Sequence, residues 1–395
     1  MGQVSGEHVF SPFPLECSMP VMNFLTQCVF DSGALKQLAK LAKARGITRP
    51  FIVTDAGIKA SGILAKVEDA LGVAPAGVFA ETVPNPTEAQ TKVATALYKE
   101  SGADGIIAVG GGSSMDHAKA IGLMASHDEP LETYAAIIGG SKLVGKIPPL
   151  IAIPTTAGTG SEVSIGMVII MENGRKETFA SPNLIPLVAL CDPDLTIGLP
   201  AGLTAATGMD ALTHCIEAIL TPAINPPAEG IGYDGARRAF GMDMLKRAVR
   251  DGSDEEARWH MMMASYEGAL AFVKGLGGVH ALSHAAGRLH DKKLHHGTLN
   301  AVFLPHILRF HNGAADEKYA RLREAMGLKA NADLADAIQD LNDAIGIPKT
   351  LSAMGLSASD GPGIVEYALV DLAHAGNPRP MSADDYAAVY ETALG

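Results

Sequence analysis

The stretch ADGIIAVGGGSSMDHAKAIG at residues 103–122 joins an apolar, β-branched run to a helical pattern through consecutive glycines. Comparable apolar runs occur at 50–57 (PFIVTDAG), 149–158 (PLIAIPTTAG) and 166–174 (GMVIIMENG). The segments between these runs repeat apolar residues every three or four positions, as amphipathic helices do. Because strands that alternate with helices are typical of βαβ units, we predict an α/β domain built on a parallel sheet.

The pattern changes after about residue 195. Strand-like runs give way to long helical patterns, and Pro and Gly cluster at 192–203. A cluster of these residues between two differently patterned halves favours a link between domains. We therefore predict an α/β domain over residues 1–195 and an all-helical domain over residues 196–395. A cleft between two such domains is a common place for a small-molecule site.

The composition excludes several classes of protein. Of the 395 residues, 47% are apolar and 19% are charged, which is typical of a globular chain. Acidic residues outnumber Lys and Arg by 43 to 31 and no basic run occurs, so we expect no nucleic-acid partner. No apolar run is long enough to span a bilayer and the first residues lack a secretory pattern, so we expect no membrane partner. Four cysteines without a C-x-x-C pair favour reduced thiols in the cytoplasm.

Three glycines, Gly110, Gly111 and Gly112, directly follow a predicted strand and precede a helix that we expect to begin near Met115. Glycines at this point let the backbone approach a diphosphate, and the free N–H groups of the helix attract an anion. Ser113 can donate a further hydrogen bond. The run therefore indicates a dinucleotide-binding loop, with an ordinary strand-to-helix turn as the alternative.

Two other features bear on the nucleotide. Asp55 ends the predicted strand FIVTD, where a carboxylate can bond ribose hydroxyls and would repel the extra phosphate of NADP. A turn aspartate is the alternative for this single residue. The string GIGYDG at 230–235 also fits a dinucleotide-binding pattern, but it follows no predicted strand, and we reject it.

Histidines gather in the second half of the chain, where Asp210 and His214 are four residues apart in one helical pattern. His280 and His284 have the same spacing, so each pair shares a helix face. Together with His296 they form a set of one carboxylate and several imidazoles, which suits Fe²⁺ or Zn²⁺. Hydrogen-bonded core histidines are the alternative to a metal site.

Several longer motifs carry a resemblance to a known family. They are VPNPT (83–87), GGGSSMDHAK (110–119), IPTTAGTGSE (153–162), GMDALTH (208–214), GVHALSH (278–284), HHGTLNAVFLPH (295–306) and GNPR (376–379). In this order they cover the chain from about residue 20 to its end. The chain closely resembles the iron-containing (group III) alcohol dehydrogenases, near the lactaldehyde–propanediol oxidoreductase type.

The resemblance implies an N-terminal dinucleotide-binding domain, a helical metal domain and at least a homodimer. It also implies a cofactor, NAD in preference to NADP because of Asp55, and a metal, Fe²⁺ with Zn²⁺ as the alternative. The implied metal ligands are Asp210, His214, His280 and His296. The implied cofactor-binding residues are Asp55, Asn85, Gly110, Gly111, Gly112, Ser113, Asp116, Thr155, Thr156, Thr159 and, near the ribose, Lys176.

The chain departs from the family between His284 and the HHG segment, where AAGRLHDKKL at 285–294 is about two residues longer than usual. The insertion leaves His295 and His290 as competitors of His296 for the fourth ligand position. It also places cations close in sequence to the metal ligands, namely Arg288, His290, Lys292 and Lys293. We hypothesise that this loop favours a substrate with a carboxylate, sulfonate or phosphonate tail; a solvated charged loop is the alternative.

The sequence thus predicts a metal-dependent dehydrogenase that transfers a hydride between NAD(H) and a small alcohol or aldehyde. His284 resembles the family's second, non-coordinating histidine and is expected to relay the proton, while Glu217 is interpreted as supporting a metal ligand or the fold. The alternatives are a metal-independent maleylacetate reductase-like enzyme, a dehydroquinate synthase-like lyase and a non-catalytic nucleotide-binding protein.

Overall fold

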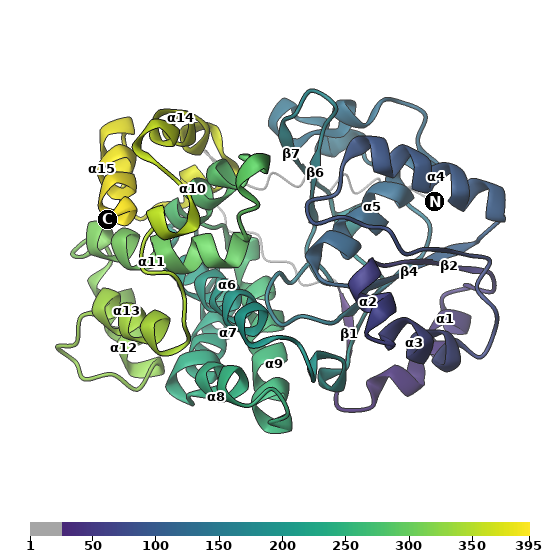
Figure 1. Ribbon diagram of the computed structural model, residues 1–395, viewed down its shortest axis with the longest axis horizontal. Coiled ribbons are helices and arrows are strands. Elements are labelled where there is room, and N and C mark those ends of the chain that lie inside the picture. Colours follow the sequence, from purple (N-terminus) through teal and green to yellow (C-terminus); the bar gives the residue numbers. More distant parts are fainter. Residues whose placement is uncertain (1–25) are drawn as a thin grey trace, which may run out of the picture.

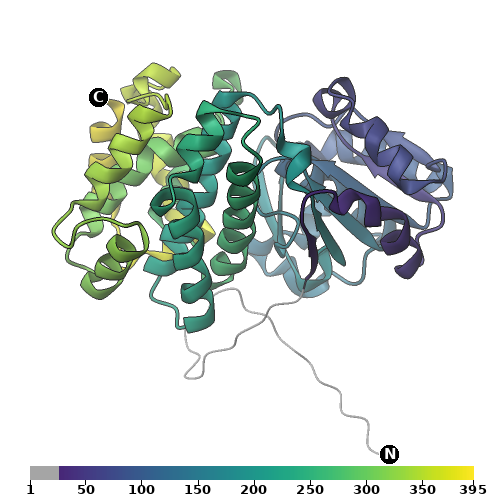
Figure 2. The same cartoon turned by 90° about the horizontal axis from the view of Figure 1, so that it is seen from below.

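The computed structural model describes residues 26–395, apart from the side chain of His290. The expectation drawn from the first residues lies outside this range, as does Cys17. An α/β part and a helical part lie side by side (Figure 1; Figure 2). The strands are β1 (Gln27–Phe30), β2 (Pro50–Val53), β3 (Gly77–Phe79), β4 (Gly105–Gly110), β5 (Leu150–Pro154), β6 (Gly166–Ile170), β7 (Lys176–Ala180) and β8 (Val188–Cys191).

The helices divide between the two parts. The α/β part contains α1 (Leu38–Ala44), α2 (Ala56–Ala60), α3 (Ile63–Leu71), α4 (Glu88–Ser101) and α5 (Gly112–Ser126). The helical part contains α6 (Ala201–Leu220), α7 (Pro226–Ala236), α8 (Met244–Arg250), α9 (Glu255–Ala271), α10 (Gly278–Ala286), α11 (His296–His311), α12 (Asp316–Ala325), α13 (Leu334–Ala344), α14 (Gly361–Val370) and α15 (Ala383–Leu394).

The main sheet is parallel, with strand order β1-β8-β5-β4-β2-β3. Side chains such as Ile52 and Ile107 pack on one face with α1 and α3, and Phe51 and Ile106 pack on the other with α4 and α5. Because both faces are covered, the central strands are apolar along their whole length. The predicted fold class, a parallel α/β domain followed by an all-helical part, is confirmed.

One expected strand belongs elsewhere. The apolar run at 166–174 does not join the parallel sheet; β6 pairs antiparallel with β7 in a separate two-stranded sheet, with Gly174 in the turn at φ 79°. The expectation of a parallel strand there was wrong, because an apolar run of this length reads the same in either kind of sheet. The short strands β1, β3 and β8 were not predicted, because their sequences show no distinct strand pattern.

Helix α6 is the centre of the helical part and packs against α7, α9 and α11. Every residue from Thr204 to Leu220 is buried, so the helix carries its polar side chains inside the protein.

Strand β8 ends at Cys191 and α6 begins at Ala201, and the predicted domain boundary at residue 195 lies between them. The string at 230–235 lies inside α7, in keeping with its rejection as a nucleotide loop. In the described range, no helix has both the length and the apolar character needed to cross a membrane.

A glycine at the start of α11 allows this helix to touch α6. A Cβ atom at Gly297 would lie 2.1 Å from the carbonyl oxygen of Ala206, so neither backbone could stay in place. We expect Gly297→Ala to lower the free energy of unfolding by about 1–3 kcal/mol. Gly230→Ala is the control, because a Cβ there meets nothing within 4 Å, and helix propensity predicts a gain of up to about 1 kcal/mol. Urea unfolding of both variants checks this; equal midpoints would contradict the packing argument.

Candidate active site

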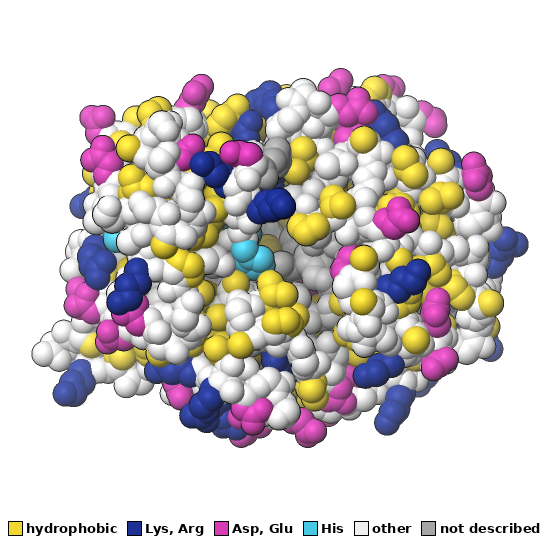
Figure 3. Space-filling model, in the orientation of Figure 1, with side chains coloured by type: hydrophobic (Ala, Val, Ile, Leu, Met, Phe, Trp, Pro, Cys, Tyr) yellow, Lys and Arg dark blue, Asp and Glu magenta, His cyan; other side chains and the backbone are white. Residues whose placement is uncertain are grey.

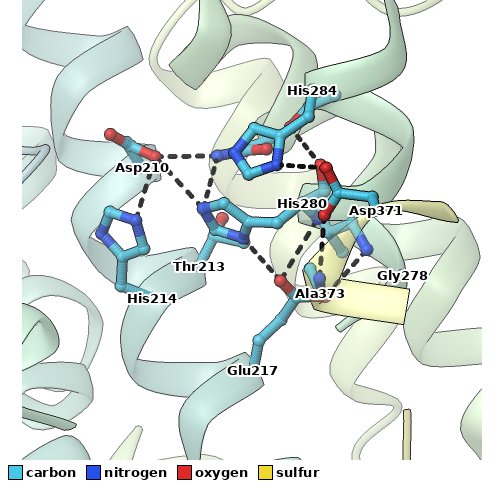
Figure 4. A network of polar contacts seen from close by, with 12 residues as sticks. Asp210, Thr213, His214, Glu217, Gly278, His280, His284, Asp371 and Ala373 are labelled. Carbon is cyan, nitrogen blue, oxygen red and sulfur yellow. Dashed lines mark hydrogen bonds and ion pairs between the residues drawn. The ribbon is translucent and has the colours of Figure 1, made fainter. Parts of the chain in front are cut away.

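Three helices bring the predicted metal ligands together. Asp210 on α6, His280 on α10 and His296 on α11 offer ligand atoms that lie within 4.8 Å of one another. The Oδ1 atom of Asp210 is 3.8 Å from Nε2 of His280 and 3.5 Å from Nε2 of His296. Nε2 of His214 is 3.7 Å from the same oxygen, and Figure 4 shows His214 and His280 on either side of it. One carboxylate and three imidazole nitrogens are a donor set that fits Fe²⁺ or Zn²⁺.

The charges in this set suit a cation. Burial acts to raise the pKa of the Asp210 carboxyl. The neighbouring His214, His296 and His280 lower it by more than burial raises it, so the net shift is downward. Burial lowers the pKa of His214 to about 4 and that of His296 well below its usual value. Burial also acts to lower the pKa of His280, yet the nearby carboxylate of Asp210 and the hydrogen bond to Glu217 raise it to about 9. The site therefore combines an ionised carboxylate with two imidazoles that are neutral at pH 7 and a third, His280, that would release its proton when a metal binds.

Each of the three imidazoles is held through Nδ1, which directs its Nε2 toward Asp210. Fixing one ring nitrogen in this way sets the orientation of a metal-binding histidine. The contacts on Nδ1 are Glu217 Oε2 for His280 (2.6 Å), the Gly158 carbonyl oxygen for His214 (3.2 Å) and Ser283 Oγ for His296 (3.3 Å).

Glu217 also accepts hydrogen bonds from the backbone at the start of α10. Its Oε1 accepts a hydrogen bond from the backbone N–H of Val279 at 2.8 Å, and its Oε2 accepts one from the N–H of His280 at 3.3 Å. The carboxylate thus caps the helix that carries His280 while it orients the ring. The interpretation of Glu217 as a supporting residue agrees with these bonds.

Asn300 is a contact that the sequence analysis missed. Its Nδ2 donates to Asp210 Oδ1 at 2.7 Å and lies 3.3 Å from Nε2 of His280 and 3.2 Å from Nε2 of His296. Asn300 is one helical turn beyond His296, so the same four-residue spacing that identified the histidine pairs could have revealed it.

His284 stands beside the metal ligands rather than among them. Its ring stacks on His296 with centroids 5.2 Å apart, and its Nδ1 lies 3.0 Å from Asp371 Oδ2. Figure 4 shows this pair of side chains next to His280. The side chain of His284 is 27% exposed, so the ring contacts both His296 and solvent.

Asp371 is the other residue that the sequence did not reveal. It follows α14 and accepts a hydrogen bond from the N–H of Ala373 at 2.8 Å. Burial acts to raise the pKa of its carboxyl, but the charge and hydrogen bond of His284 lower it, so the net shift is downward. The two residues are 87 positions apart, and no local pattern connects them.

The predicted dinucleotide loop lies between β4 and α5. Gly110 has φ +143°, and a Cβ at this residue would lie 2.5 Å from Ser114 Oγ. A Cβ at Gly112 would lie 2.8 Å from Thr159 Cγ2. Helix α5 begins at Gly112, three residues earlier than expected, so the loop's last glycine already belongs to the helix. Only glycine fits this turn, which leaves its backbone N–H groups free of side-chain cover.

Threonines of the 155–159 segment border the same loop. The N–H of Thr155 donates to the carbonyl oxygen of Gly110 at 3.0 Å. A Cβ at Gly111 would lie 3.4 Å from Thr156 Oγ1. That hydroxyl is buried and has no hydrogen-bond partner in the described part of the chain. A buried donor without a partner is costly, and a phosphate oxygen would satisfy it.

Three more of the predicted cofactor residues are linked by hydrogen bonds. The N–H of Asn85, a residue with φ 56°, donates to Ser113 Oγ at 3.2 Å, and Nζ of Lys176 on β7 donates to Asn85 Oδ1 at 2.9 Å. Burial lowers the pKa of Lys176. These bonds connect the VPNPT segment to both the glycine loop and the β6–β7 hairpin.

The two aspartates predicted for the nucleotide site, Asp55 and Asp116, accept hydrogen bonds from other residues of the protein. Asp55 caps α2 by accepting from the N–H of Ile58 at 3.0 Å, and its Oδ2 accepts from Ser114 Oγ at 3.2 Å, so it lies beside the glycine loop. Asp116 accepts from Ser161 Oγ at 2.6 Å and from the N–H of Val168 at 2.9 Å. Asp116 thereby fixes the segment behind the loop.

A pocket opens between the β6–β7 hairpin and helices α10 and α14, and Figure 3 shows a hollow between the two parts of the molecule. His284, Asp371 and Lys176 line it, as does Arg288 from the inserted segment. His295 is exposed at the N-terminus of α11, whereas His296 faces Asp210. The side chain of His290, the other competing ligand, is outside the described residues.

Comparisons with known proteins agree with this geometry. The iron-containing alcohol dehydrogenase model matches residues 26–193, and the C-terminal model of the Fe-containing alcohol dehydrogenase family matches residues 204–394. The chain is 50% identical over 384 residues to 4-hydroxybutyrate dehydrogenase of Cupriavidus necator, covering 95% of this chain and 100% of that protein.

Solved structures give the same result. A 1,3-propanediol oxidoreductase has TM-score 0.89 and 34% identity, covering 94% of this chain and 100% of that one. Sulfoacetaldehyde reductase from Bifidobacterium kashiwanohense, in complex with NAD⁺, has TM-score 0.87 and 28% identity, covering 95% and 99%. These relatives are named as dehydrogenases, oxidoreductases and an aldehyde reductase, so they do not favour the maleylacetate reductase-like, lyase or non-catalytic alternatives. The chain therefore belongs to the iron-containing alcohol dehydrogenase family.

Proposed function

We propose that the chain uses NAD(H) and a divalent metal, Fe²⁺ or Zn²⁺, to interconvert a short alcohol and its aldehyde. The observation that carries the proposal is the convergence of Asp210 Oδ1 with the Nε2 atoms of His214, His280 and His296. When bound, the metal supplies Lewis-acid polarisation of the substrate oxygen and the dinucleotide supplies the hydride acceptor.

The chain's own residues hold these groups. Asp210 and the three histidines hold the metal, and the hydrogen bonds on Nδ1 keep each imidazole in the tautomer that leaves Nε2 free. Gly110, Gly111, Gly112 and Ser113 with Thr155, Thr156 and Thr159 bind the diphosphate, and Asn85 with Lys176 completes the wall toward the pocket. Asp116 positions the threonine segment through Ser161.

His284 moves the proton. Asp371 holds its Nδ1, which leaves Nε2 free to take up a proton as the alcohol is oxidised and to release it to solvent. The partial exposure of the ring supports this route, and its stacking on His296 keeps it next to the ligand set. In the direction of aldehyde reduction the same atoms return the proton.

We infer that the substrate is a short hydroxy acid of the 4-hydroxybutyrate type. The support is the 50% identity to a 4-hydroxybutyrate dehydrogenase, together with the structural likeness to a sulfoacetaldehyde reductase, whose substrate also carries an anion. A cytoplasmic location and a homodimer or larger homo-oligomer complete the proposal. The free thiols of Cys28, Cys191 and Cys215 support a reducing compartment, and the family resemblance supports the oligomer.

The proton relay is tested by His284→Gln in the metal-loaded enzyme. Glutamine keeps much of the side-chain volume but cannot exchange a proton, so we expect kcat to fall by about 10²-fold or more while bound metal stays at the wild-type level. His306→Gln is the control, because His306 lies on the same helix as His296 but forms no hydrogen bond to the site among the residues described. Steady-state kinetics and metal analysis check this; a loss of metal equal to the loss of rate would make His284 a ligand instead.

The choice of dinucleotide is tested by Asp55→Asn, because asparagine keeps the cap on α2 while it removes the charge. Loss of a repulsion of about 1 kcal/mol predicts that kcat/KM for NADP rises about 5-fold or more relative to that for NAD. Asp69→Asn, an exposed residue of α3, controls for the change in net charge. An unchanged cofactor ratio would show that Asp55 is only a helix cap.

A further inference from the structure

Arg288 is the cation of the inserted segment that lines the pocket between the β6–β7 hairpin and helices α10 and α14. It lies two residues beyond the end of α10 and lines the pocket together with His284. The two residues are four positions apart in the chain, and the proton-relay residue His284 lies against the ligand His296. A short substrate with its hydroxyl near the metal ligands can therefore extend its other end toward Arg288.

The other cations of the insertion point elsewhere. Lys292 lies 4.0 Å from Asp360, to which it is paired, and Lys293 is exposed. Neither lysine lines the pocket. The structure thus narrows the hypothesis of a basic loop to one side chain within the described part of the insertion.

The remaining basic side chains of the pocket wall have partners. Arg175 is paired with Glu177 through a 3.3 Å contact, and Lys176 donates to Asn85. Arg288 forms no ion pair among the residues described, although Glu177 and Glu366 are near enough to influence it. Its charge is therefore available to a ligand.

The guanidinium of Arg288 is also preorganised. It lies over the ring of Tyr367 on α14, which fixes its plane. Its Nε is buried and lacks a hydrogen-bond partner in the part of the chain that the structure describes. Because Arg288 lines the pocket, a carboxylate bound there would pair with the charge of its guanidinium.

We propose that Arg288 is the specificity-determining residue of this enzyme and binds the carboxylate of a short hydroxy acid whose hydroxyl is oxidised at the metal site. This inference rests on the proposed function and adds the residue that selects the substrate. A planar guanidinium and a carboxylate form strong, charge-assisted hydrogen bonds, and an alcohol without the carboxylate gains nothing from them. Because the tail is bound equally in the ground state and the transition state, its loss raises KM more than it lowers kcat.

The test compares 4-hydroxybutyrate with 1-butanol as substrates of the metal-loaded enzyme and NAD. In Arg288→Leu we expect the ratio of kcat/KM for 4-hydroxybutyrate to that for 1-butanol to fall about 10- to 100-fold, mainly through KM. Arg288→Lys keeps the charge but loses the planar fork, so its ratio is expected to lie between those of Arg288→Leu and the wild type. Lys292→Leu and Lys293→Leu remove the same charge within a few residues and should leave the ratio at the wild-type value.

Inhibition by butyrate gives a second readout that does not depend on turnover of the acid. Butyrate should compete with 1-butanol in the wild type and in both lysine variants, and much less in Arg288→Leu. Thermal unfolding of every variant shows whether the fold is kept. If Arg288→Leu is unstable, Arg288→Lys replaces it as the variant that tests the role of Arg288.

The outcomes separate the two levels of the argument. A wild type that oxidises neither substrate would overturn the proposed function and this inference with it. A wild type that prefers 1-butanol, or an Arg288→Leu enzyme with an unchanged substrate ratio and unchanged butyrate inhibition, would overturn the role of Arg288 while the dehydrogenase remains. A ratio that falls equally in the lysine variants would also overturn it, because the effect would then come from overall charge.

Discussion

The buried carboxylate of Asp210 is the constraint on which the structure depends. An ionised group inside a protein is costly unless opposite charges and hydrogen bonds compensate it. Here the amide of Asn300 donates a hydrogen bond to the carboxylate, and the proposed metal, held with imidazoles on three different helices, would supply the opposite charge. The helices must therefore meet at one point, and glycines such as Gly297 on α11 and Gly268 on α9 allow α6 to be approached that closely.

One segment contacts both the α/β part and the helical part of the molecule. Residues 155–159 leave β5, and Thr155 is bonded to the glycine loop that we assign to the nucleotide. The carbonyl oxygen of Gly158 in the same segment contacts His214 Nδ1, and a Cβ at Gly158 would lie 2.8 Å from the carbonyl oxygen of Thr207 on α6. The segment that borders the nucleotide thus also orients a metal ligand, so the proposed hydride acceptor and the proposed metal are placed by the same few residues.

The parts of the structure that follow from local pattern could be predicted from the sequence. The strand–glycine–helix run at 103–122 identified the sheet, and the four-residue spacing of Asp210 and His214 placed both on one helix face. The β6–β7 hairpin could not be predicted, because pairing direction depends on partners distant in the chain. Asp371 was missed for the same reason, since its bond to His284 arises only when α14 packs on α10. Likewise, the sequence could not show that Arg288 lines the pocket whereas Lys292 and Lys293 do not, because this depends on the three-dimensional path of the insertion.

The central claim is that the donor set around Asp210 holds a metal required for hydride transfer. The most direct measurement removes metal with a chelator and follows NADH formation from NAD and 4-hydroxybutyrate before and after Fe²⁺ or Zn²⁺ is returned. The account predicts that the stripped enzyme is inactive and that turnover returns as the metal content approaches one ion per chain. A stripped enzyme that keeps its full rate would contradict the account and would favour metal-independent reduction of the maleylacetate reductase kind.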